Sequence, residues 1–275
     1  IFPYTTLFRS LNNVLGVLVG YSELLLEKIP QPSPLRRYVD RILQSGLKGA
    51  AIIQDLLTLA RRGVAVSEVV NLNGVVSDYL QSPEFENLNI HHPRVTFQSD
   101  LDRDLLSIHG SPVHLSKTIM NLVANAAEAI SGEGVVSIQT RNRYLDRPIR
   151  RYDDMREGDY VVLTISDTGK GIASKDREKI FEPFYTKKVM GRSGTGLGLA
   201  VVWGAVKDHR GYIDVQSEEG KGSIFTLYFP VTREPAGKDR EAVSPESYMG
   251  KGESILVVDD RSEEHTSELQ SRHNL

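Results

Sequence analysis

Two asparagines, Asn121 and Asn125, stand four residues apart in the largely apolar stretch NLVANAAEA. Residues at this spacing project from the same face of a helix, so both carboxamides can face one ligand. A carboxamide oxygen is a hard, neutral ligand that suits a magnesium ion already carrying phosphate oxygens and water. The pair therefore indicates a site for a metal-bound phosphate compound on this helix.

Asp167 ends an apolar stretch and is followed at once by Gly169 and Gly171, in ISDTGKGI. Glycine allows a sharp turn and a close approach of the backbone to a ligand. A buried carboxylate here would accept a hydrogen bond from the exocyclic amine of adenine; the alternative is an ordinary turn aspartate. A dinucleotide fold is disfavoured, because Ser174 replaces its third glycine and Asp167 would repel a pyrophosphate.

A third glycine-containing stretch, GTGLGLAVV, places Gly194, Gly196 and Gly198 before an apolar helix. The free amides and positive dipole at such a helix start favour phosphate. Each dipole contact contributes only about 0.3 to 1 kcal/mol, so we expect Lys187 and magnesium to act with these amides. The phosphate-loop pattern GxxxxGK[ST] is absent, and the loop before Gly194 is a candidate lid.

These residues need a scaffold of alternating strands and helices, which the sequence predicts after Val66 as a layered α/β sandwich. The predicted strands are 95–99, 106–109, 135–140, 160–166, 211–216 and 223–229, and the predicted helices are 74–80, 113–130 and 197–209. We expect 141–159 to be a charged surface excursion and 233–252 to be a linker.

Two amphipathic helices precede the sandwich, at residues 11–29 and 35–62, separated by the proline-rich IPQPSP. Such a pair cannot enclose its own apolar faces. A dimeric four-helix bundle would cover them, and so would packing against the rest of the same chain. The predicted fold class is thus α+β, a helical hairpin followed by a two-layer α/β sandwich.

Composition limits the possible functions. The chain has 275 residues, 40% hydrophobic and 25% charged, with a formal net charge of -3. This balance gives no electrostatic reason to bind nucleic acid. The absence of cysteine suits a cytoplasmic protein, and no apolar run reaches the roughly 20 residues that span a membrane.

The two ends have a different character. Leu7–Ser10 can be encoded by CTCTTCCGATCT and Arg261–Glu264 by AGATCGGAAGAG, which are reverse complements. We interpret residues 1–10 and 261–275 as translated sequencing adapter, the alternative being two unusual natural tails. Residues 253–260 then form the first strand of a further, interrupted domain.

In this order and spacing, NLVAN, DTGKG, FEPF and GTGLGL resemble the N, G1, F and G2 boxes of sensor histidine kinases. The resemblance implies a HisKA-type dimerisation hairpin at 11–63 and a Bergerat-type ATP-binding domain at 66–232. It implies ATP and Mg²⁺ as cofactors, with Asn125 on magnesium and Asp167 on adenine. Phe181 and Phe184 resemble lid anchors, although either suits a core equally well. The implied cofactor-binding set is Asn125, Asp167, Gly169, Gly171, Phe181, Phe184, Lys187, Gly194, Thr195, Gly196, Leu197 and Gly198.

The same resemblance implies how phosphate would move. Related ATPases use a glutamate base where this chain has Asn121, and an amide cannot take a proton from water. In the kinases the nucleophile is a hairpin histidine, which the alignment on LNN places at Arg9, with an acidic neighbour at Ser10. A guanidinium is no nucleophile. Asn13 resembles the residue that orients water for dephosphorylation of a partner.

Asp259 and Asp260, after ILVV, resemble the magnesium-binding acidic pair of receiver domains; the alternative is an acidic strand end. The sequence thus predicts a fragment of a hybrid sensor histidine kinase that is homodimeric through 11–63 and has a receiver domain as partner. Its parent would pass phosphate from ATP to histidine and then to aspartate. Two rival hypotheses are a non-catalytic nucleotide-binding dimerisation module and a stand-alone ATPase.

Overall fold

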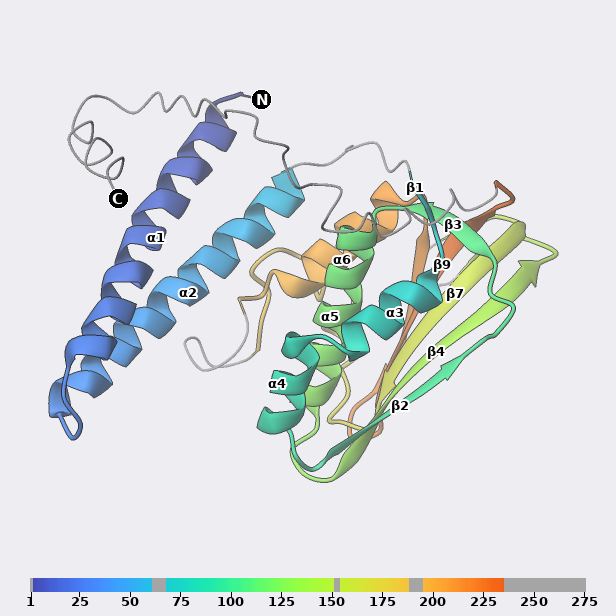
Figure 1. Cartoon of the computed structure of the whole chain (residues 1–275). Coiled ribbons are helices and arrows are strands. Elements are labelled where there is room, and N and C mark those ends of the chain that lie inside the picture. Colours follow the sequence, from blue (N-terminus) through green and yellow to red (C-terminus); the bar gives the residue numbers. More distant parts are fainter. Residues whose placement is uncertain (1, 61–67, 151–153, 188–194, 235–275) are drawn as a thin grey trace, which may run out of the picture. The chain divides into compact units, whose positions relative to one another are not determined.

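The computed structural model describes residues 2–60, 68–150, 154–187 and 195–234. It begins with two long helices, α1 (Phe2–Lys28) and α2 (Pro34–Ala60) (Figure 1). The expected start of the first helix at Leu11 is wrong, because helical backbone already begins at Phe2. Pro3 lies in the first turn, where its missing amide is tolerated, and no helix breaker follows it.

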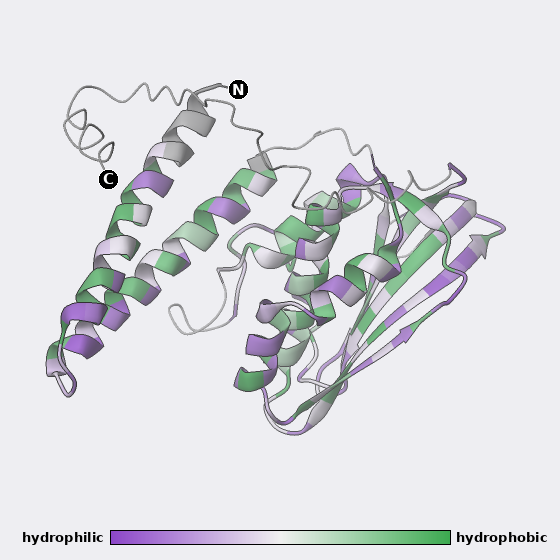
Figure 2. Cartoon of the chain, in the orientation of Figure 1, coloured by the Kyte–Doolittle hydropathy of each residue, from purple (hydrophilic) through white to green (hydrophobic). Residues whose placement is uncertain are grey.

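The two helices form a closely packed hairpin. A Cβ atom added to Gly46 would lie 2.9 Å from Cγ2 of Val19, so glycine lets α2 approach α1. At the turn, the guanidinium of Arg36 donates to the carbonyl oxygens of Leu26 (2.6 Å) and Ile29 (3.2 Å). These bonds satisfy carbonyls that the end of α1 leaves without helical partners. Figure 2 shows apolar residues recurring along both helices.

A mixed sheet dominates the described residues from Glu68 to Glu234. Seven strands join in the order β1-β3-β9-β7-β4-β2, with β8 also paired to β9. The β2–β4 pair is parallel and the other pairs are antiparallel. The strands are β1 (Glu68–Val70), β2 (Val95–Leu101), β3 (Ser107–Gly110), β4 (Gly134–Leu145), β7 (Gly158–Asp167), β8 (Tyr212–Glu218) and β9 (Gly222–Thr232).

Helices cover one face of this sheet: α3 (Leu72–Leu80), α4 (Pro83–His91), α5 (Pro112–Ala129) and α6 (Gly198–Asp208) (Figure 1). Alternation along β7 explains the layering, because Val161, Leu163 and Ile165 all enter the core beneath the helices. On α5, Ile119 and Val123 lie one turn apart and are both fully buried. The predicted two-layer α/β sandwich is therefore confirmed.

Three local predictions differ from the structure. Strand β1 and helix α4 were not predicted. Ser82 caps α4, Pro83 begins it and His91 ends it. The described residues of the predicted surface excursion at 141–159 include regular strands, because β4 continues to Leu145 and β7 begins at Gly158. A short ribbon of β5 (Ile149–Arg150) and β6 (Asp154–Met155) follows. Met155 is only 1% exposed and packs beside Tyr160, so apolar burial holds this segment.

Candidate nucleotide site

Helix α5 supplies one wall of a cavity of about 540 Å³. Its start is fixed by Ser111, whose hydroxyl accepts a hydrogen bond from the amide of His114, and by Pro112 in the first turn. Asn121, Asn125 and Glu128 follow at spacings of four and three residues and all line the cavity. The spacing that buries the apolar face of α5 in the core thus turns these polar groups toward the cavity.

Asp167 closes β7 at the edge of this cavity, and its side chain is buried. Its Oδ1 accepts the amide of Gly169 at 2.7 Å. Burial raises the pKa of the Asp167 carboxyl above its ordinary value, and hydrogen bonds from Gly169 and Ser223 partly oppose that increase. The buried carboxylate is thus a desolvated acceptor, suited to accept a hydrogen bond from one donor group of a ligand.

Two glycines hold the loops around the cavity. Gly171 has φ +68°, and a Cβ there would lie 2.0 Å from the carbonyl oxygen of Glu218. Gly196 has φ +71°, and a Cβ there would lie 2.6 Å from the carbonyl carbon of Phe184. Both positions therefore require glycine for two reasons, backbone conformation and close contact.

The second glycine stretch leads directly into α6. The amide of Phe184 donates to the carbonyl oxygen of Gly196 at 2.9 Å, and the amide of Leu197 donates to Oγ1 of Thr195 at 3.2 Å. No side chain caps the start of α6 among the described residues. Gly198 and Leu199, in its first turn, line the cavity, so the start of α6 offers backbone amides to an anion there.

Comparison with known proteins agrees with this geometry. The family model "Histidine kinase-, DNA gyrase B-, and HSP90-like ATPase" matches residues 110–233, and the "His Kinase A (phospho-acceptor) domain" model matches residues 9–64. Sensor kinase CckA of Brucella abortus (strain 2308) is 32% identical over 257 residues, which cover 90% of this chain and 27% of CckA. The chain belongs to the sensor histidine kinases.

Other relatives agree. Sensor histidine kinase ZraS of Escherichia coli (strain K12) is 30% identical over 232 residues, covering 83% of this chain and 46% of ZraS. The chain thus spans less than half the length of these curated relatives. Full-length ShkA, crystallised in complex with AMPPNP, shares the fold with a TM-score of 0.64 at 24% identity, covering 85% of this chain and 46% of ShkA.

Within this histidine kinase domain, the structure gathers eight of the predicted site residues around the cavity. Two further predicted residues lie next to this group. The amide of Gly169 donates to Oδ1 of Asp167, and Leu197, between Gly196 and Gly198, is fully buried. The eight cavity residues are Asn121, Asn125, Asp167, Gly171, Lys187, Thr195, Gly196 and Gly198.

The remaining predicted residues lie elsewhere. Phe181 is buried in the core beside Trp203, with ring centroids 5.1 Å apart, and the side chain of Phe184 is 60% exposed. Neither lines the cavity. Asn13 is an exposed residue of α1, and position 9, where the kinase pattern has histidine, is Arg9 on the same helix. Three predicted residues, Gly194, Asp259 and Asp260, fall outside the described residues.

Sequence reasoning missed several cavity residues. Asp176, Tyr185 and Lys170 come from the segment after Asp167, and Ser223 and Phe225 come from β9. On β9, Phe225 belongs to a regular alternation of core residues, which gives no sign of ligand contact. The sequence signal for Asp176 was equally weak, since a single acidic residue in a polar turn is usually solvated.

A magnesium ion fits this site only together with a phosphate ligand. Within the described ranges, no three His, Cys, Asp or Glu side chains form a group that could hold a metal by themselves. The donor in the right place is the carboxamide of Asn125, whose oxygen suits a hard cation. The other ligands would come from phosphate and water, as is usual for magnesium at nucleotide sites.

Proposed function

We propose that this chain is the phosphoacceptor-hairpin and ATP-binding part of a hybrid sensor histidine kinase. It binds Mg-ATP, and the whole protein transfers the γ-phosphate to a hairpin histidine and then to a receiver aspartate. One observation carries the proposal: a buried carboxylate, Asp167, shares a cavity with Asn125 and the start of α6. This combination provides separate recognition of a purine amine, a metal-bound phosphate and further phosphate oxygens.

Each residue has a defined task in this proposal. Asp167 accepts a hydrogen bond from the exocyclic amine of adenine, and Asn125 contributes one oxygen to magnesium. When bound, magnesium neutralises phosphate charge and orients the γ-phosphate. Lys187 and the amides of the glycine loop contact the polyphosphate. Asn121 cannot act as a base, so transfer depends on a nucleophile from the hairpin.

The kinase proposal is tested by restoring the hairpin nucleophile. The chain as it stands should bind Mg-ATP but acquire no acid-labile label from γ-labelled ATP, because Arg9 cannot form a phosphoramidate. The double substitution Arg9→His with Ser10→Asp should confer labelling. Adding Asp167→Asn to that variant should remove the label again. Labelling of the unsubstituted chain, or a silent restored variant that binds ATP, would contradict the proposal.

An ATPase is the second candidate, because the carboxylate of Glu128 also lines the cavity. Steady release of phosphate from Mg-ATP by the unsubstituted chain, lost in Glu128→Gln, would favour it. ATP binding without either hydrolysis or labelling of the restored variant would favour the non-catalytic dimerisation module.

Dimerisation through the hairpin is supported by apolar side chains that α1 and α2 leave uncovered. Val14 is 64% exposed, Val17 59% and Tyr21 66%, and these positions recur on α1 every three or four residues. Burying such a stripe against a second copy is the usual way to complete a bundle of four helices. Sedimentation should show a dimer, and Val14→Glu with Val17→Glu should give a monomer, whereas Glu23→Gln should not.

The receiver part of the proposal rests on the sequence alone, through Asp259 and Asp260. A longer chain that includes the complete domain after residue 253 should move label from histidine to aspartate, converting acid-labile into base-labile phosphate. Among the described residues, no helix combines the length and apolarity needed to cross a bilayer.

A further inference from the structure

Asp176 belongs to the turn segment that follows Gly171 and forms part of the cavity wall. Its amide donates to the carbonyl oxygen of Ala173 at 2.9 Å, and its own carbonyl oxygen accepts the amide of Lys179 at 2.8 Å. The side chain is only 11% exposed. A carboxylate held this firmly at a site for an anionic ligand is unexpected, because it would repel phosphate unless a cation neutralises it.

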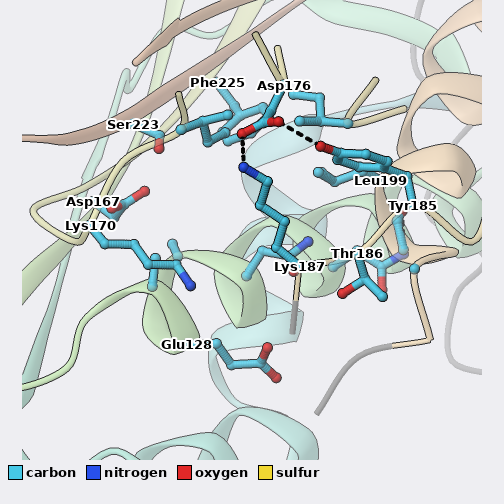
Figure 3. A pocket seen from close by; sticks show the side chains of 18 of the residues that line it. Glu128, Asp167, Lys170, Asp176, Tyr185, Thr186, Lys187, Leu199, Ser223 and Phe225 are labelled. Carbon is cyan, nitrogen blue, oxygen red and sulfur yellow. Dashed lines mark hydrogen bonds and ion pairs between the residues drawn. The ribbon is translucent and has the colours of Figure 1, made fainter. Parts of the chain in front are cut away.

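The cation comes from the segment after Phe184. Tyr185 donates its hydroxyl to Oδ1 of Asp176 at 2.8 Å, and the ammonium of Lys187 pairs with Oδ2. Figure 3 shows both side chains converging on Asp176 within the cavity. One carboxylate thus fixes two side chains of the same short segment, one through each oxygen.

The charges of this cluster are stable at neutral pH. Hydrogen bonds from Lys187 and then Tyr185 lower the pKa of the Asp176 carboxyl, and the same contact with Asp176 raises the pKa of Lys187. Both shifts favour the ionised pair. At neutral pH the pair therefore consists of a carboxylate and an ammonium group.

The pair leaves the lysine able to bind a ligand. An ammonium group has three N–H donors, and Asp176 receives one of them in the structure. The side chain of Lys187 is 57% exposed and lines the cavity. A lysine that rotates freely loses side-chain entropy when a ligand fixes it, and a lysine already held by Asp176 loses less.

We propose that Asp176 is a positioning residue for nucleotide binding: its carboxylate holds the ammonium of Lys187 in the cavity, ready to contact the polyphosphate. Tyr185 fixes the carboxylate from its other oxygen. This inference rests on the proposed ATP site and assigns that site a residue outside its four sequence boxes. It requires that Asp176 acts only through Lys187 and only on ligands that carry phosphate.

A double-mutant cycle tests this dependence. The affinities of Mg-ATP and of adenosine are measured by calorimetry for the unsubstituted chain, Asp176→Asn, Lys187→Met and the double variant. Asp176→Asn should weaken ATP binding about three- to fivefold, the range of a partly exposed ion pair, and leave adenosine binding unchanged. In the Lys187→Met background, Asp176→Asn should have no further effect on ATP.

Two variants complete the design. Glu178→Gln removes an exposed carboxylate two residues away and should leave both affinities unchanged. Asp176→Glu keeps the charge but moves it by one methylene, so it should lose less ATP affinity than Asp176→Asn. It also serves as the test if Asp176→Asn does not fold, as judged by thermal unfolding.

The outcomes separate the two proposals. Tighter ATP binding by Asp176→Asn would show that the carboxylate competes with phosphate for Lys187, which overturns the inference. An equal loss in the Lys187→Met background, or an equal loss for adenosine, would also overturn it. Failure of the unsubstituted chain to bind either ligand would instead contradict the proposed function.

Discussion

The carboxamide nitrogen of Asn121 donates to the carbonyl oxygen of Gly198, at 3.2 Å. This bond joins the middle of α5 to the first residue of α6, 77 positions further along the chain. Asn121, which the resemblance aligns with the glutamate base of related ATPases, thus also holds the start of α6, whose amides would contact phosphate in the proposed ATP site. A substitution of Asn121 is therefore expected to change both the packing of α5 against α6 and the chemistry of the cavity.

Asn121→Asp should lower the stability of the fold as well as disturb the cavity. The new carboxylate would place an acceptor against the carbonyl oxygen of Gly198, so a hydrogen bond becomes a repulsion. We expect the free energy of unfolding to fall by about 1 to 3 kcal/mol, measured by urea titration without ligand. The control is the same substitution at exposed Asn87. An equal loss of stability in Asn87→Asp would show that the bond from Asn121 to Gly198 does not stabilise the fold.

Asp167→Asn should reduce ATP affinity about tenfold, because the charge-assisted bond to the adenine amine is lost. It should also reduce the preference for ATP over GTP, whose purine carries an oxygen at that position. Nucleotide titrations by calorimetry give both quantities. Asp159→Asn, near the other end of β7, should change neither. If Asp167→Asn kept the full preference for ATP over GTP, a group other than Asp167 would recognise adenine.

The raised pKa of Asp167 predicts a pH dependence of binding. Burial favours the protonated acid, and the neutral acid is a weaker acceptor for the adenine amine than the carboxylate is. ATP affinity should therefore fall as the pH is lowered, and the fall should begin at a higher pH than for an ordinary carboxyl with a pKa of about 3.9. Asp167→Asn should abolish this dependence, so a variant that retains it would assign it to another group.

Gly171→Ala should destabilise the turn that follows Asp167, because the added Cβ would lie 2.0 Å from the carbonyl oxygen of Glu218. Gly220 is a matched control: its φ is +79°, and nothing lies within 4 Å of an added Cβ. Gly220→Ala should cost only the left-handed conformation, about 1 to 2 kcal/mol, and Gly171→Ala should cost clearly more. Thermal unfolding compares them, and similar losses would show that the backbone near Glu218 yields easily.

His209 makes the fold sensitive to acid. Its Nε2 accepts the amide of Ser111 at 2.9 Å and its Nδ1 lies 2.7 Å from the carbonyl oxygen of Ala205, so the ring is neutral. Burial lowers the pKa of His209. The unfolded chain thus takes up this proton first, and the stability that neutral His209 provides is present above about pH 6.5 and is lost as the pH falls through its lowered native pKa.

Urea unfolding between pH 7.5 and pH 5 measures this effect. His209→Leu should lose about 2 kcal/mol at neutral pH, because two hydrogen bonds disappear, and should then show a weaker pH dependence than the unsubstituted chain. His91→Gln, at the exposed end of α4, should change neither quantity. An unchanged slope in His209→Leu would assign the acid sensitivity to other groups.

The amino-acid sequence alone predicted the hairpin, the main strands and part of the cavity lining, namely Asn121, Asn125, Asp167 and the glycine positions. The reason is local: periodicity of two or about 3.6 residues follows from backbone geometry, and glycine is favoured where φ is positive, as at Gly171 and Gly196. Segments held by distant partners were missed. Met155 is ordered by burial beside Tyr160, and α4 packs Phe85 against Tyr79 and Phe97, contacts that no local pattern shows.

Which polar groups meet is shown only by the tertiary structure. Asp176 and Lys187 are 11 residues apart in a segment without regular periodicity, and Asn121 meets Gly198 across 77 positions. A single sequence specifies the chemistry of each side chain but not the distance between two of them. That distance depends on how the sheet and its helices bring separate loops to one cavity.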